Sequence, residues 1–118
     1  KSKIIGVTLL TSHNEESMNH LGMNARKDIV KSLSIIASDT KIDGVVCSPG
    51  DIDSINTSKN KLEFITPGIR LNDNSNDHSK IYTPRTALEL GSSYLVIGRP
   101  ITEAKDPMSI VEQIKLMI

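Results

Sequence analysis

The sequence predicts an α/β fold built on parallel strands. Short apolar runs alternate with segments of helical periodicity along the chain, and such alternation is typical of parallel strands joined by right-handed helical crossovers. Apolar residues make up 37% and charged residues 24%, as in ordinary globular domains. Two architectures fit: an open doubly wound sheet, or part of an eight-stranded barrel with helices outside. The 118 residues hold four strand–helix units, and a full barrel needs about 250 residues.

The first unit begins with a strand predicted for residues 3–10, KIIGVTLL. Its nearly continuous apolar run is expected for a strand covered on both faces. The polar segment that follows favours a short helical turn from Ser12 or Asn14. A helix is predicted for residues 24–37, with one apolar stripe because its isoleucines and leucine recur at spacings of three and four: Ile29, Leu33 and Ile36.

The second strand is predicted for residues 42–48, IDGVVCS. A short helix should follow it, with Ser48 as N-cap and Pro49 at the first helical position. The third strand is predicted for residues 62–68, LEFITPG, and the Asn- and Asp-rich residues 70–80 predict an exposed loop. That loop is either a lid over a site or a plain connection.

The last two helices carry clear start and stop signals. Thr83 before Pro84 predicts an N-cap, and Gly91 predicts the end of that helix. A fourth strand is predicted for residues 94–98, YLVIG. Asp106 before a proline should cap the final helix, whose buried stripe is formed by Ile110, Val111, Ile114 and Met117.

Composition narrows the possible partners and location. The net charge is zero, which gives no basis for capturing nucleic acid or an anionic membrane. Cys47 is the only cysteine, so no disulfide forms within the chain, which fits the reducing cytoplasm. No apolar run approaches the roughly 20 residues needed to span a bilayer, and the start of the chain is interpreted as a strand and not a signal peptide.

Each of the last two predicted strands ends in a glycine and is followed by an arginine: Gly68 with Arg70, and Gly98 with Arg99. Ligands of parallel α/β folds lie at the carboxyl ends of the strands. Glycine lets the backbone approach a phosphate, and arginine adds a charge and a planar fork of N–H donors. In barrels the loops after strands seven and eight commonly form a phosphate site. The pattern therefore favours phosphate binding over the alternative of turn glycines beside solvated arginines.

Four motifs also resemble a known family. The segments TLLTS, DGVVCSPGD, FITPGIR and YLVIGRPITEAKDP resemble the C-terminal half of bacterial orotidine 5′-phosphate decarboxylase, from Ile4 to the last helix. The resemblance implies half of a TIM (β/α)8 barrel, strands five to eight with their helices, so that residues 1–118 form a single C-terminal half-barrel segment. It also implies conversion of orotidine 5′-monophosphate (OMP) to uridine 5′-monophosphate (UMP) and CO2 in pyrimidine biosynthesis, with no metal and no organic cofactor.

The resemblance implies a set of substrate-binding residues. Thr11 matches the hydroxyl residue that contacts the pyrimidine ring, and Arg70 matches an arginine that lines the substrate site. Gly98 and Arg99 match the phosphate grip.

One further site residue departs from the family pattern. The family's D-Q-x-R motif, which precedes the T-P of the next helix, reads DHSK here. His78 takes the position of the glutamine that bridges base and phosphate, and Lys80 takes the position of the arginine. A histidine donates to phosphate, but it lacks the paired donor and acceptor of an amide.

No catalytic residue is assigned to this chain. The family's charged Asp-x-Lys-x-x-Asp array lies on the third strand of the barrel, in the N-terminal half. The segment DTKID, residues 39–43, is superficially similar. Its second Asp comes one residue too early and precedes a strand, so it is interpreted as surface charge.

The remaining polar residues favour plain structural roles. His13, Glu15, Glu16 and His20 lack a spacing that turns four ligands inward, so a solvated loop is expected and no metal. Cys47 is interpreted as a small buried residue, since a nucleophile needs a base beside it. The first turns of the helix at residues 24–37 carry a cationic face, interpreted as solvated: Arg26, Lys27 and Lys31.

Three functional hypotheses follow. The first is the C-terminal half of an orotidine 5′-phosphate decarboxylase, inactive alone and dependent on an N-terminal half that carries the catalytic array. The second is a non-catalytic half-barrel remnant that self-associates and at most binds phosphate. The third, ranked last because no Gly-x-Gly-x-x-Gly turn is present, is a small doubly wound phosphate-binding domain. The expected partners are OMP or UMP, and either another copy of the chain or the N-terminal half.

Overall fold

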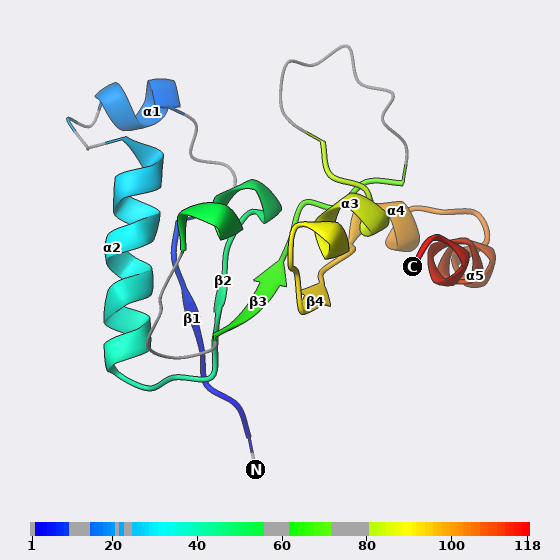
Figure 1. The fold of residues 1–118 in the computed structure, drawn as a ribbon. Helices are drawn as coiled ribbons and strands as arrows, with labels where there is room; N and C mark the ends of the chain where they lie inside the picture. Colours follow the sequence, from blue (N-terminus) through cyan, green and yellow to red (C-terminus); the bar gives the residue numbers. More distant parts are fainter. Residues whose placement is uncertain (1, 10–14, 21, 23–24, 56–61, 72–80) are drawn as a thin grey trace.

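The computed structural model describes residues 2–9, 15–20, 22, 25–55, 62–71 and 81–118. Its centre is one parallel sheet of four strands in the order β1-β2-β3-β4 (Figure 1). The strands are β1 (Ile5–Val7), β2 (Gly44–Val46), β3 (Glu63–Thr66) and β4 (Tyr94–Leu95). The prediction of an α/β fold with parallel strands is confirmed.

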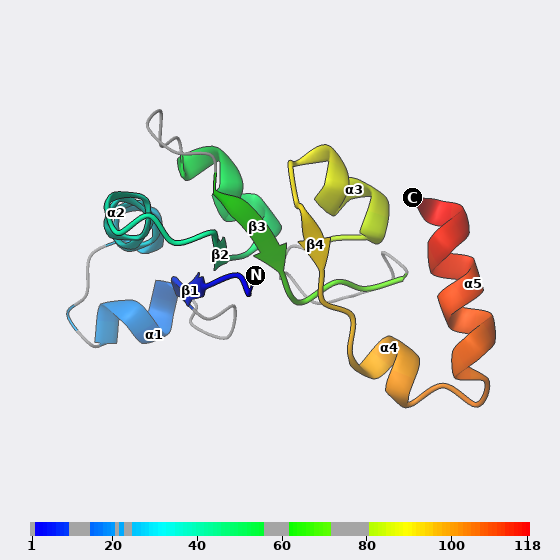
Figure 2. The same ribbon diagram turned by 90° about the horizontal axis from the view of Figure 1, so that it is seen from below.

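Along the chain, helices connect the four strands, and two more helices follow the last strand. They are α1 (Glu15–His20), α2 (Arg26–Asp39), the 3-10 helix η1 (Pro49–Ser54), α3 (Pro84–Glu89), α4 (Arg99–Thr102) and α5 (Pro107–Met117). Figure 2 shows η1 and α3 on the same side of the strands. Helix α2 contacts β2 and η1, and α5 contacts α3 and α4. Among the described residues, no helix has the length and apolar character needed to cross a membrane.

The strand order distinguishes the two architectures that the sequence left open. A doubly wound sheet reverses its strand order at a switch point, whereas this sheet runs in sequence order from edge to edge. Its radius of gyration is 15.3 Å, compared with about 13.5 Å for a compact domain of this length. The sequential strand order and the extended shape are those expected for part of a barrel.

The main core lies between the sheet and α2. Its buried members are Val30, Ala37, Val45, Cys47, Ile55 and Leu62. The predicted stripe of α2 is only partly correct: Ile29 and Leu33 are half-buried, but Ile36 is 59% exposed, and the buried residues are Val30, Ser34, Ala37 and Ser38. The Ser34 hydroxyl donates to the Val30 carbonyl at 2.7 Å, so this buried hydroxyl has its hydrogen-bond partner within the helix. Small side chains let the helix approach the sheet, and Ile35 and Ile36 remain exposed.

Local signals placed most helix ends correctly. The Thr83 side chain accepts from the Thr86 amide at 3.2 Å in a capping box, and Asp106 accepts from Ser109 at 3.1 Å. Gly91 has φ +105° just after α3, which the left-handed region allows to glycine. Ser48 is the N-cap of η1, with a proline following it, but its side chain makes no capping bond.

Several predicted bounds differ from the structure. The strands cover only part of the predicted residues 3–10 and 94–98, since β1 is Ile5–Val7 and β4 is Tyr94–Leu95. Helix α4 was not predicted: Gly98 is its N-cap, so the chain leaves the sheet for a helical turn at once. The stripe of α5 is confirmed in outline, with Ile114 buried and its neighbours on that face half-buried.

Candidate functional site

Two exposed arginines lie at the carboxyl ends of adjacent strands. Arg70 follows β3, Arg99 follows β4, and these strands pair in register through Thr66 and Leu95. Within the described part of the chain, neither arginine side chain forms an ion pair or a hydrogen bond. Two cations with no partner among the described residues thus follow neighbouring strands at one end of the sheet.

Gly98 connects β4 to α4 at this corner. Its carbonyl accepts the amides of Ile101 at 2.8 Å and Thr102 at 3.1 Å, which fixes the turn that presents Arg99. A side chain at position 98 would meet no atom within 4 Å. The backbone at Gly98 is therefore not covered by neighbouring atoms.

Gly68 makes the turn on the neighbouring strand. Its φ of +81° lies in the left-handed region, which favours glycine. After this turn Ile69 pairs with Tyr82, and the Arg70 amide donates to the Tyr82 carbonyl at 2.9 Å. The two ends of the predicted loop 70–80 are thereby tied together. His78 and Lys80 lie within it, outside the described residues.

We predict that Gly68→Ala lowers the free energy of unfolding by about 1–2 kcal/mol, because an L side chain is strained at this φ. Steric contact adds nothing, since an added Cβ would meet no atom within 4 Å. The urea midpoint of the purified chain measures the change. Gly68→Asn is the matched control and should lose less, because asparagine tolerates the left-handed region. Equal losses for the two variants would contradict this explanation.

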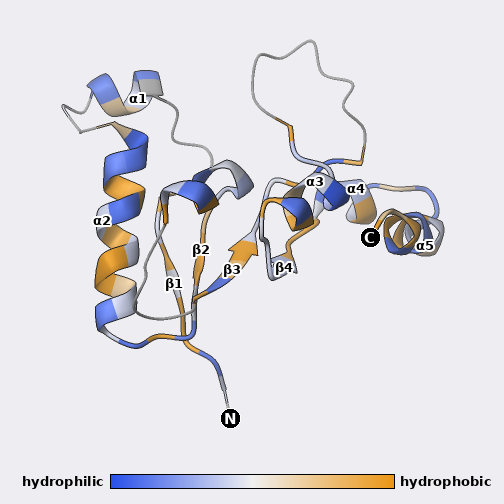
Figure 3. Cartoon of the chain, in the orientation of Figure 1, coloured by the Kyte–Doolittle hydropathy of each residue, from blue (hydrophilic) through white to orange (hydrophobic). Residues whose placement is uncertain are grey.

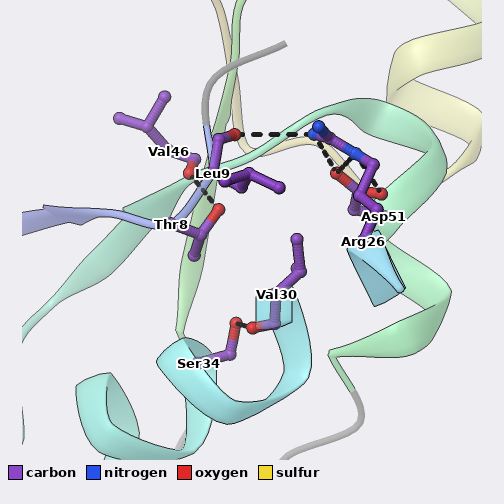
Figure 4. Close-up of polar contacts among 7 residues, drawn as sticks. All are labelled: Thr8, Leu9, Arg26, Val30, Ser34, Val46 and Asp51. Atoms are coloured by element: carbon purple, nitrogen blue, oxygen red, sulfur yellow. Dashed lines mark hydrogen bonds and ion pairs between the residues drawn. The ribbon is translucent and has the colours of Figure 1, made fainter. Parts of the chain in front are cut away.

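The end of β1 is held by contacts to two other elements. The Thr8 hydroxyl donates to the Val46 carbonyl at 2.8 Å, and Arg26 donates to the Leu9 carbonyl at 3.5 Å (Figure 4). Thr11, the predicted pyrimidine contact, follows two positions later, outside the described residues. The structure thus brings Arg70, Gly98 and Arg99 to neighbouring strand ends and leaves Thr11 and His78 undescribed.

An ion pair that the sequence pattern did not reveal lies beside these strand ends. Arg26, at the start of α2, donates to both carboxylate oxygens of Asp51 in η1, with the shortest distance 2.7 Å (Figure 4). The side chains are 16% and 8% exposed, so the prediction of a solvated Arg26 is wrong. The sequence did contain an indication of this pair: Arg26 is a cation in the first turn of a helix, where it opposes the helix dipole, so a carboxylate partner was to be expected.

Cys47 and Tyr82 lie close enough to this pair for its charges to act on them. Burial, and then the charge of Asp51, raise the pKa of the Cys47 thiol to about 12, so the thiol is protonated at neutral pH. Burial is also the main reason why the pKa of Tyr82 is raised. Cys47 is 1% exposed, which confirms the expected buried role.

The other polar candidates lie away from the strand ends. Asp39, Lys41 and Asp43 are exposed, and the Asp43 carboxylate accepts the Ile4 amide at 2.7 Å, so the DTKID segment serves the opposite end of the sheet. His20 contacts the Glu16 carbonyl at 2.8 Å within α1, whereas His13 and the side chain of Glu15 are not described. Within the described residues, no group of three His, Cys, Asp or Glu side chains is placed to hold a metal ion.

Comparison with known proteins decides the family. The sequence model of the "Orotidine 5'-phosphate decarboxylase / HUMPS family" matches residues 1–114. The chain belongs to this family. The resemblance stated from the four motifs is therefore confirmed.

Relatives in the family match nearly the whole chain but only half of their own length. The orotidine 5′-phosphate decarboxylase of Dictyoglomus thermophilum is 43% identical over 98% of this chain and 49% of that protein. The enzyme of Nitrosomonas eutropha is 42% identical over 96% of this chain and 50% of that protein. The chain thus spans about half the length of these curated relatives.

Solved structures give the same fraction. The crystal structure of the orotidine 5′-phosphate decarboxylase of Lactobacillus acidophilus matches with a TM-score of 0.75 and 35% identity, over 98% of this chain and 48% of that chain. A Methanocaldococcus jannaschii structure described as complexed with the inhibitor BMP matches with a TM-score of 0.64 at 20% identity, over 98% and 49%, which shows the fold alone. The fold is half of the family's TIM barrel, with the arginine corner at the carboxyl ends of its strands.

Proposed function

We propose that this chain is the substrate-binding C-terminal half of an orotidine 5′-phosphate decarboxylase, which converts OMP to UMP and CO2. The observation that carries the proposal is the corner at the ends of β3 and β4, where Arg70 and Arg99 are exposed and without a side-chain partner in the described part of the chain. Family membership supplies the substrate class.

The phosphate of the nucleotide is assigned to this corner. A phosphate needs several donors, and an arginine fork offers two parallel N–H groups to its oxygens. Gly98 keeps the adjoining backbone open, and Gly68 turns the chain that carries Arg70. Barrels commonly bind phosphate on the loops after strands seven and eight, which are the loops that follow β3 and β4 when β1 is counted as strand five.

Thr11 and His78 are proposed to contact the rest of the nucleotide. Thr11 follows β1, whose end is fixed to β2 by the Thr8 hydroxyl. His78 belongs to the segment whose ends are joined through Arg70 and Tyr82. Both belong to segments that follow the carboxyl ends of strands, so Thr11 is assigned to the pyrimidine ring and His78 to the base and the phosphate.

We propose that the chain alone does not catalyse decarboxylation. The reaction replaces a carboxylate by a proton, so it needs a proton donor at the ring. The Asp51 carboxylate beside the strand ends is bound to Arg26, and the pKa of about 12 keeps the Cys47 thiol from ionising. The charged Lys and Asp array is assigned to an N-terminal half that completes the barrel, in the cytoplasm and with no cofactor.

A second candidate is a non-catalytic half-barrel that self-associates and at most binds phosphate. The observation that favours it is exposed apolar surface, including Val7, Val96 and Leu116, which a lone half-barrel leaves open. It keeps the arginine corner but has no turnover under any condition.

One assay separates the two candidates. Purified chain is mixed with OMP, and the loss of OMP ultraviolet absorbance is followed with and without the N-terminal half of the Dictyoglomus thermophilum relative. The proposal expects no turnover alone and turnover on mixing. Turnover by the chain alone would overturn both candidates, and no turnover on mixing, with complex formation demonstrated by sedimentation, would favour the remnant.

A further inference from the structure

The backbone of Arg70 is bonded to a residue that lies further along the chain. The Arg70 amide donates to the Tyr82 carbonyl at 2.9 Å, and Ile69 forms a parallel bridge with the same tyrosine. Tyr82 directly precedes Thr83, whose capping box fixes the first turn of α3. The place of the Arg70 backbone after β3 therefore depends on the place of Tyr82.

The side chain of Tyr82 packs against η1. A Cβ atom added to Gly50 would overlap the Tyr82 hydroxyl oxygen and would lie 3.0 Å from the ring carbon that bears it. The side chains of Tyr82 and Ser48 also form a hydrogen bond. The end of the ring thus lies directly on the backbone of Gly50.

This close approach, and not the backbone conformation, requires glycine at position 50. Among the described glycines, those with positive φ are Gly22, Gly68 and Gly91, so the backbone of Gly50 is compatible with alanine. The Tyr82 ring, however, leaves no room for a methyl group there. A glycine that is required by one neighbouring side chain indicates a specific contact between η1 and the segment before α3.

Contacts to two other elements hold η1 in place. Arg26 of α2 donates to both carboxylate oxygens of Asp51, and it also donates to the Leu9 carbonyl after β1 (Figure 4). The Asp51 amide donates to the Ser48 carbonyl at 2.9 Å within the turn. Figure 3 shows this polar turn after the apolar strand β2. The surface against which Tyr82 packs is therefore fixed at the carboxyl end of the sheet.

The two exposed arginines are positioned in different ways. Arg99 starts α4, where the Gly98 carbonyl accepts the amides of Ile101 and Thr102, so neighbours in sequence fix the turn that carries it. Arg70 lies in no helix or strand, and its side chain has no partner within the described part of the chain. Guanidinium contacts to phosphate are directional, so the place of the Arg70 backbone matters for binding.

We propose that Tyr82, held by its contact with Gly50, is a positioning residue that sets where Arg70 meets the phosphate of the nucleotide. Tyr82 acts through the backbone of Arg70 and does not itself touch the nucleotide. The inference rests on the proposed function, because it requires Arg70 to bind phosphate. It makes part of the phosphate affinity depend on a contact between η1 and the segment before α3.

Gly50→Ala tests the proposal through isothermal titration of the purified chain with UMP and with uridine. The added methyl group displaces the Tyr82 ring, so the Kd for UMP should rise about 10-fold, whereas the Kd for uridine should stay the same. Hydrogen exchange at the Arg70 amide should become faster, because its bond to Tyr82 is loosened. Gly6→Ala is the matched control. Its methyl group would meet Cδ1 of Ile42 at 2.8 Å, and it should change neither the Kd for UMP nor the exchange at Arg70.

Tyr82→Phe gives a second test, whose sign depends on the residue at position 50. In the unaltered chain it removes the hydrogen bond to Ser48 and should raise the Kd for UMP about 3-fold. In the Gly50→Ala chain it removes the oxygen atom that the methyl group overlaps, so it should lower the Kd. General loss of stability does not produce such a reversal. Tyr94→Phe, which removes a hydroxyl that accepts from Lys3, should have no effect in either chain.

A double-mutant cycle shows whether the contact acts through Arg70. In the Arg70→Ala chain, Gly50→Ala should have no further effect on the Kd for UMP. An equal effect of Gly50→Ala with and without Arg70 would overturn the proposal, and so would equal weakening of UMP and uridine binding.

The outcomes separate failure of this inference from failure of the proposed function. If Arg70→Ala weakens UMP binding and Gly50→Ala does not, Tyr82 does not position Arg70, and the phosphate site stands. If neither Arg70→Ala nor Arg99→Ala changes the Kd for UMP, or if the chain does not bind UMP, the phosphate site is rejected and this inference with it. Circular dichroism shows whether each variant folds. Should Gly50→Ala be unfolded, unchanged UMP affinity and unchanged exchange at Arg70 in Tyr82→Phe would overturn the inference.

Discussion

Arg26→Met is expected to lower the free energy of unfolding by about 3–5 kcal/mol, because it leaves a buried carboxylate without its cation. Asp51 is 8% exposed, and Arg26 is the cation that contacts both its oxygens. The loss is a large share of the total stability of a domain of this size. The denaturant midpoint at pH 7, with the m-value checked for constancy, measures it.

Two further variants separate the ion pair from other consequences of the change. Lys27→Met removes an exposed cation one position away and should change stability by less than about 0.5 kcal/mol. Arg26→Met combined with Asp51→Leu removes both charges, and it should recover most of the loss, since buried ion pairs are often replaced by apolar residues at little cost. A double variant as unstable as Arg26→Met would show that packing, and not the unpaired charge, explains the effect.

The elements that could be predicted are those fixed by local chemistry. Thr83 and Asp106 cap α3 and α5 through hydrogen bonds to residues three positions later, and such contacts are readable from a few residues. The parallel sheet followed from the alternation of strands and helices. The position of Gly98 and Arg99 after β4 was also predictable, because sequence order defines which residues follow a strand.

What could not be predicted depends on contacts between distant segments. The apolar pattern of α2 selected Ile36, but the helix packs through Ser34 and Ala37, and only the shape of the opposing sheet decides between these faces. The partners Arg26 and Asp51 are separated by 25 positions, and no local periodicity joins them. Helix α4 was missed because its four residues are too few for a periodic signal.

The half-barrel explains why so much apolar surface coexists with a well-formed core. Helix α2 covers one face of the sheet and buries Val30 and Val45 almost completely, so this layer is finished within the chain. On the other face, Val7 and Tyr94 are 58% and 51% exposed, and this is the face that lines the interior in a closed barrel. One face of the sheet is therefore buried within the chain, whereas the other face remains partly exposed.

Arg99→Ala is expected to weaken binding of UMP by about 1.5–3 kcal/mol, or roughly 10- to 150-fold in Kd, as for loss of a charge-assisted hydrogen bond to phosphate. Arg99 is exposed at the end of β4 with no partner of its own among the described residues, so its removal should leave folding almost unchanged. Isothermal titration of the chain, alone and with the N-terminal half of a relative, measures the Kd. Binding of uridine, which lacks the phosphate, should change by less than about 0.5 kcal/mol.

The comparison of the two ligands is what assigns the role. If Arg99 binds phosphate, the binding free energy lost on its removal comes from the phosphate group, so the affinity for UMP falls and the affinity for uridine does not. If Arg99 instead supports the local fold of α4, both ligands lose affinity equally, and the assignment fails. Lys105→Ala removes another exposed cation, after α4, and it should leave both affinities unchanged. If Lys105→Ala weakened UMP binding as much as Arg99→Ala, the cause would be attraction by overall charge, which salt screens, and not a specific phosphate contact at the end of β4.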